Sequence, residues 1–110
     1  MHDVDLIDTQ ELKAKLDRGE DFRVVMTLGE WECRTTHIPG SMRISTVQEA
    51  LETLDPEDEI VLYDSGPSCS ASRMAFRVLK SHGYEHVRRY AGGLEACASA
   101  GYPLEGESVE

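Results

Sequence analysis

The sequence predicts an α/β fold in which a mostly parallel central sheet is flanked by helices. Short apolar runs of strand length alternate along the chain with segments whose apolar residues recur at helical spacing. Glycines, prolines and small polar residues separate these runs, as at turns. Alternation of this kind is typical of layered α/β domains. The 110 residues suit one domain, which we place at residues 1–104, before an acidic tail over 105–110.

Five strands are expected at the apolar runs. They are short candidates over residues 4–7 and 42–44, a buried strand over 23–27, the clearest strand over 59–63, and a last strand over 86–90. Pro39 and Gly40 predict a turn over residues 37–41. A single turn of helix is expected over residues 30–34.

The helices are marked by their caps and their apolar spacing. Asp8 or Thr9 caps the first helix, Glu11 suits a capping box, and Gly19 ends the pattern. Thr46 caps the second. The third follows the loop after residue 63, and Gly83 stops it. A last short helix follows Gly92 and Gly93. The apolar residues that define the helix faces are Leu12, Leu16, Val47, Ala50, Leu51, Leu54, Ala71, Met74, Ala75, Val78 and Leu79.

The composition excludes several function classes. A formal net charge of −10 repels nucleic acid and anionic membranes. Solubility or a high-salt cytoplasm explains such acidity, and an acidic patch for a basic partner is the alternative. Three cysteines without paired spacing argue against disulfides, and the histidines show no ligand spacing. We expect a cytoplasmic protein without a signal peptide, membrane span, metal or cofactor.

Residues 64–70 are the segment most suited to chemistry. They leave the C-terminal end of a central strand and enter a helix, where open α/β sheets place ligands. Converging backbone N–H groups and the helix dipole suit a small anion or a thiolate. The expected anion-binding loop consists of Ser65, Gly66, Pro67, Ser68, Cys69 and Ser70.

Four segments then resemble one family. They are residues 37–41 (His-Ile-Pro-Gly-Ser), residues 60–63 with the loop that follows, residues 83–94 with their paired glycines, and residues 100–104. In this order they are similar to the motifs of the rhodanese-like (sulfurtransferase) domain. The resemblance implies a three-layer α/β fold and sulfur transfer. A cysteine at the start of the loop takes sulfur from a sulfane-sulfur donor such as thiosulfate and carries it as a persulfide.

The sequence departs from that pattern at the nucleophile itself. Asp64 stands where the family keeps its cysteine, and a carboxylate forms no persulfide. Residues 26–28 lack the family's Asp-x-Arg triplet, and Cys33 and Cys97 replace common aromatic residues. We therefore expect a non-catalytic or weakly active sulfur-handling or regulatory module, with a protein partner or a small anion as its ligand.

Cys69 is the candidate nucleophile that remains in the loop. The helix start and Arg73 would lower the pKa of its thiol, which gives the alternative of a sulfurtransferase or persulfide carrier. The competing interpretation is a small buried residue at the helix start. The loop of the related phosphatases has an arginine six residues after its cysteine. Counted from Cys69 that position is Ala75, so a phosphatase is not expected. Cys33 and Cys97 are expected in the core, His37 in a structural hydrogen bond, and the arginines at 73, 77, 88 and 89 on solvated faces.

Overall fold

Four parallel strands form the sheet at the centre of the chain. The computed structural model describes residues 6–19, 21–27, 37–38, 41–44, 46–64, 71–90, 92–102 and 104. The strands are β1 (Arg23–Met26), β2 (Met42–Arg43), β3 (Ile60–Tyr63) and β4 (Val87–Tyr90). They lie in the order β2-β1-β3-β4, and every neighbouring pair is parallel. The predicted parallel sheet is confirmed.

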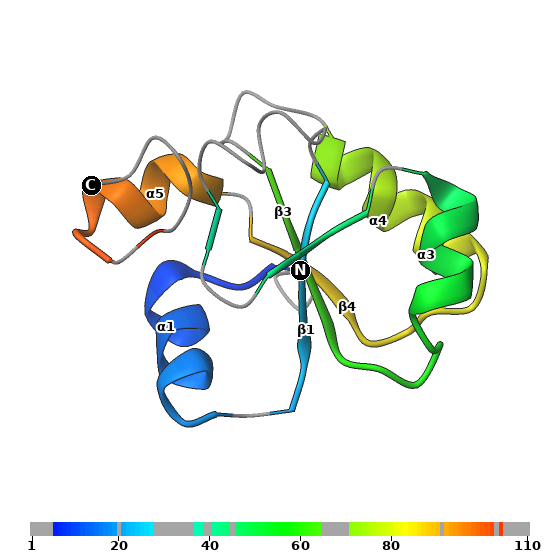
Figure 1. The fold of residues 1–110 in the computed structure, drawn as a ribbon, viewed down its shortest axis with the longest axis horizontal. Helices are drawn as coiled ribbons and strands as arrows, with labels where there is room; N and C mark the ends of the chain where they lie inside the picture. Colours follow the sequence, from blue (N-terminus) through cyan, green and yellow to red (C-terminus); the bar gives the residue numbers. More distant parts are fainter. Residues whose placement is uncertain are drawn as a thin grey trace.

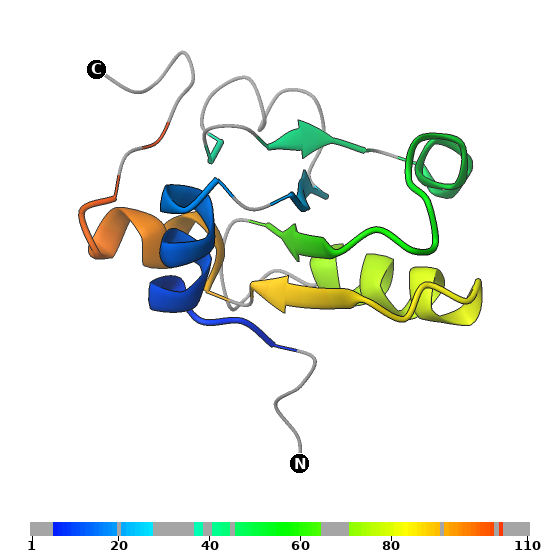
Figure 2. The same cartoon turned by 90° about the horizontal axis from the view of Figure 1, so that it is seen from below.

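Helices cover both faces of this sheet. They are α1 (Thr9–Asp17), α3 (Val47–Thr53), α4 (Ala71–Ser81) and α5 (Gly93–Ser99). Figure 1 shows α1 and α5 on one side of the strands and α3 and α4 on the other. The turned view keeps the same three layers (Figure 2). None of the helices in the described part of the chain is long and apolar enough to cross a membrane.

The helix ends follow the signals in the sequence. The Asp8 side chain accepts a hydrogen bond from the N–H of Glu11 at 2.8 Å, and Thr46 accepts one from Glu49 at 3.1 Å. The carboxylate of Glu11 pairs with Arg88 at 3.1 Å. Gly19 and Gly83 adopt φ values of +68° and +89° after α1 and α4, where glycine carries little steric penalty.

The first predicted strand is reduced to one bridge in the described residues. Leu6 pairs with Arg89, and the N–H of Ile7 donates to the carbonyl of Arg89 at 3.0 Å. This bridge lies along β4, at the edge of the sheet. The turn of helix expected over residues 30–34, and residues 4 and 5 of the predicted strand, lie outside the described residues.

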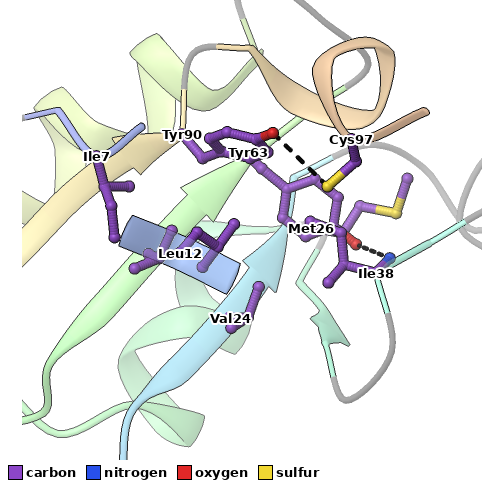
Figure 3. Packing of buried hydrophobic residues seen from close by; sticks show 9 residues of the cluster. Ile7, Leu12, Val24, Met26, Ile38, Tyr63, Tyr90 and Cys97 are labelled. Atoms are coloured by element: carbon purple, nitrogen blue, oxygen red, sulfur yellow. Dashed lines mark hydrogen bonds between the residues drawn. The ribbon is translucent and has the colours of Figure 1, made fainter. Parts of the chain in front are cut away.

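Two apolar clusters pack on opposite faces of the sheet because successive strand residues point to opposite sides. Val24, Met26, Val61 and Tyr63 face α1 and α5 (Figure 3). Val25, Ile60 and Leu62 face α3 and α4. All four residues of β3 are buried, as expected for a strand covered on both faces. This burial fixes the C-terminal end of β3, where the candidate site begins.

Candidate functional site

Asp64 is the first residue after β3 and is 0% exposed. Its carboxylate Oδ2 accepts a hydrogen bond from the backbone N–H of Ser72 in the first turn of α4, at 2.9 Å. Its carbonyl oxygen accepts another from the N–H of Leu94, in the first turn of α5, at 3.0 Å. Asp64 therefore connects the end of the central strand to the amino ends of two helices.

The surroundings of Asp64 explain how a buried carboxylate is accommodated here. The first N–H groups of a helix lack partners within the helix. A carboxylate that accepts from one of them makes a charge-assisted hydrogen bond and lies at the positive end of the helix dipole. The end of the strand thus places an anion of the protein itself at the amino end of α4.

Ser72 and Arg89 extend this cluster. Ser72 is 0% exposed, and its Oγ accepts a hydrogen bond from Nε of the half-buried Arg89 at 3.3 Å. Arg89 is paired in register with Leu62, whose side chain packs against α3 and α4. The expectation that Arg89 lies on a solvated face is therefore wrong. The alternation of side chains along β4 indicates the observed position, because it places Arg89 on the same face as buried Val87.

Tyr63 connects the site to the predicted turn over residues 37–41. Its hydroxyl accepts from the N–H of Ile38 at 3.0 Å (Figure 3). The same hydroxyl lies 2.7 Å from Oγ of Ser41. The N–H of Ser41 donates to the carbonyl of Ile38 at 3.0 Å. Thr27, directly after β1, donates both its N–H and its hydroxyl to the Tyr63 carbonyl at 3.0 Å. These bonds tie Ile38, Ser41 and the end of β1 to Tyr63, the residue directly before Asp64.

Tyr90 lies beside Tyr63 in the sheet register and makes a separate buried group. Its hydroxyl lies 2.6 Å from Oγ1 of Thr9 in α1. It donates to Sγ of Cys97 in α5 at 3.6 Å (Figure 3). Burial raises the pKa of the Tyr90 hydroxyl to about 12 and raises that of the Cys97 thiol. The predicted core position of Cys97 is confirmed, and its protonated thiol is a weak nucleophile.

The remaining predicted site residues divide into two groups. Arg73 is exposed on α4. Residues 65–70, which include Cys69, lie outside the described residues, as does Cys33. Within the described ranges, no three His, Cys, Asp or Glu side chains lie together as metal ligands would. The part of the site that the structure defines is therefore Asp64, Ser72 and Arg89. Of these three residues, the sequence predicts only Asp64 as part of the site.

Comparison with known proteins identifies one family. The family model for the rhodanese-like domain matches residues 8–100. No curated protein matches the chain. A crystal structure of a protein from Anabaena sp. is 31% identical, with a TM-score of 0.82, over 91% of this chain and 80% of that one. A solution structure of a rhodanese-like domain from Anabaena sp. is 29% identical, with a TM-score of 0.84, over 98% of this chain and 82% of that one.

The fold also matches a more distant protein from Bacillus halodurans. That structure is 23% identical, with a TM-score of 0.86, and the match covers 94% of this chain and 77% of that one. Likeness at this level of identity concerns the fold alone. The four-stranded parallel sheet with helices on both faces is therefore shared with these proteins.

Proposed function

Because this chain belongs to the rhodanese-like domain family, which is related to sulfur transfer, we propose that it is a sulfur-handling or regulatory module. In this proposal the protein itself catalyses sulfur transfer weakly or not at all. The module binds a protein partner or a small ligand. The observation that carries the proposal is the buried carboxylate of Asp64, bonded to the N–H of Ser72 at 2.9 Å.

Two physical effects of Asp64 support the proposal. Sulfur transfer through a persulfide needs a sulfur nucleophile, and a carboxylate offers none. A carboxylate also repels an anionic donor such as thiosulfate, most strongly where little water screens it. The amino end of α4, which would otherwise stabilise a thiolate or a bound anion, already has a negative partner.

The thiosulfate:cyanide sulfurtransferase assay tests this proposal. Wild-type protein and Asp64→Asn, which removes the charge without adding a thiol, should both stay at background. Asp64→Cys should raise the rate above both, because it supplies a nucleophile beside the start of α4. Wild-type turnover at the level of active single-domain relatives would contradict the proposal. Circular dichroism of each variant establishes that it is folded.

A second candidate function is a sulfurtransferase or persulfide carrier that works through Cys69. Its support is the position of α4, which begins at Ala71, two residues after Cys69. Thiolates near a helix start are stabilised by the dipole, and exposed Arg73 adds a positive charge nearby in the sequence. Sulfur loading that is abolished by Cys69→Ser but unaffected by Cys97→Ser would favour this candidate.

A further inference from the structure

Arg89 of β4 is a half-buried cation whose side chain bonds to one residue in the described part of the chain. Its Nε donates to Oγ of Ser72 at 3.3 Å, and no described carboxylate forms an ion pair with it. The neighbouring Arg88 differs, because it pairs with Glu11 at 3.1 Å and with Glu59 at 3.9 Å. Taking a guanidinium group out of water costs free energy. A negative charge near Arg89 would therefore stabilise it.

Asp64 supplies a negative charge on the same side of the sheet. Arg89 is paired in register with Leu62, and Asp64 follows Leu62 by two residues. Residues two apart along a strand point to the same face, which here is the face toward α4. Ser72 contacts both groups, since its N–H donates to Oδ2 of Asp64 at 2.9 Å and its Oγ accepts from Arg89. Asp64 and Ser72 are both 0% exposed, so little water screens the two charges.

We propose that Arg89 is a positioning residue for Asp64 and acts through Ser72. The hydrogen bond from Arg89 holds the first turn of α4 so that the N–H of Ser72 faces the carboxylate. The positive charge of Arg89, one residue away, stabilises the negative charge of Asp64. This role goes beyond the function proposed above, because it concerns how a buried carboxylate is held at position 64 whether or not the chain handles sulfur.

A double-mutant cycle, measured by urea unfolding of the full chain, tests the coupling of the two charges. Arg89→Gln should lower the folding equilibrium constant roughly tenfold in the wild-type chain, as for the loss of a charged partner. In the Asp64→Asn background the same change should lower it less than about threefold. Arg88→Gln is the matched control, because its side chain points to the opposite face, and its effect should be the same in both backgrounds. Equal effects of Arg89→Gln in both backgrounds would overturn the coupling.

Amide hydrogen exchange gives a local measurement with an internal reference. Ser72 and Leu94 both donate their backbone N–H groups to Asp64, Ser72 to the carboxylate and Leu94 to the carbonyl oxygen at 3.0 Å. Arg89→Gln should speed exchange of the Ser72 amide roughly tenfold relative to that of Leu94, because only the first bond depends on Arg89. A general loss of stability would speed both amides by the same factor, and that result would overturn the positioning role.

Two further variants separate the charge of Arg89 from its hydrogen bond. Arg89→Lys keeps the charge but not the Nε donor, and it also serves if Arg89→Gln does not fold. It should speed exchange at Ser72 relative to Leu94 by about threefold, as for a weakened hydrogen bond. A tenfold effect would overturn the contribution of the charge, and no effect would overturn that of the bond.

Ser72→Ala removes the hydroxyl and keeps the N–H that Asp64 accepts from. In this variant, Arg89→Gln should no longer speed exchange at position 72 more than at Leu94. A persisting tenfold difference would show that Arg89 does not act through Ser72. Because none of these measurements involves sulfur, their failure is separate from a failure of the proposed function, which the sulfurtransferase assay decides.

Discussion

The carboxylate of Asp64 and the backbone N–H of Ser72 are joined by a hydrogen bond of 2.9 Å, across eight residues of sequence. The bond joins the end of β3 to the start of α4, at the position where the sequence resemblance predicts a nucleophilic cysteine. The contact therefore has two consequences. Structurally, it gives the buried N–H of Ser72 at the start of α4 a hydrogen-bond acceptor. Chemically, it places a negative charge directly before residues 65–70.

The structural consequence is tested by Asp64→Ala. Removing the acceptor leaves the buried N–H of Ser72 without this partner, so the free energy of unfolding should fall by about 1–3 kcal/mol. Asp64→Asn keeps an oxygen acceptor in nearly the same place and should cost less. Urea unfolding measures both. As a control, Asp17→Ala removes an exposed pair with Lys13 and should change stability by less than about 0.5 kcal/mol. Equal stability of wild type and Asp64→Ala would show that the bond is unimportant.

Gly92 and Gly93 should tolerate side chains poorly, for two different reasons. A Cβ at Gly92 would lie 2.5 Å from Cβ of Ala96, and Gly93 has a φ of +58°. Replacing both with alanine should lower the free energy of unfolding by about 1–3 kcal/mol. Ala96→Gly should partly rescue Gly92→Ala, because it removes the clashing atom. If the losses of unfolding free energy in Gly92→Ala and in Ala96→Gly simply add in the double variant, the clash is contradicted.

Tyr90 should make the fold sensitive to alkaline pH. Burial raises the pKa of its hydroxyl from 10.0 to about 12, so the unfolded chain loses this proton at a lower pH than the native protein. The neutral hydroxyl therefore stabilises the fold fully below about pH 10, and this contribution is lost as pH rises from about 10 to 12. Tyr90→Phe should show a smaller fall in unfolding free energy over that interval. Curves of equal slope for variant and wild type would contradict this.

The three cysteines should differ in their reaction with iodoacetamide. Cys97 is buried, with a raised thiol pKa, so it should react only on unfolding. Cys33, which we predict in the core, should also be slow. Cys69, which we predict beside the start of α4, should react faster than either. Asp64→Asn should increase the Cys69 rate by removing an opposing charge. Peptide mass mapping gives the three rates, and a Cys69 that reacts only on unfolding would remove it as a nucleophile.

Much of the fold could be predicted because its signals are local. Each of these signals depends on residues close together in the sequence. They are the apolar runs of β1 and β3, the helix caps at Asp8 and Thr46, and Gly83 at the end of α4. Asp64 was recognised as a departure from a family pattern, but its bond to Ser72 depends on where α4 packs. Sequence patterns do not specify such contacts.

The larger misses came from contacts between distant segments. The sequence predicts Arg89 as a surface cation. In the structure its strand pairs with β3, and its side chain reaches Ser72 of α4. The hydroxyl of Tyr63 reaches Ile38 and Ser41 across more than twenty residues of sequence. No local spacing indicates that the hydroxyls of Tyr63 and Tyr90 bond to distant segments. An aromatic residue in a buried strand predicts packing, and the sequence does not show which group its hydroxyl contacts.

The central claim is that Asp64 takes the place of the sulfur carrier, and sulfur loading tests it most directly. The wild-type chain and Asp64→Cys are treated with thiosulfate and measured by mass spectrometry without reduction. The account predicts that wild type keeps its unmodified mass, while Asp64→Cys gains the mass of one sulfur atom on the peptide that contains position 64. A one-sulfur gain on wild-type protein, mapped to Cys69, would contradict the account and make the chain a persulfide carrier.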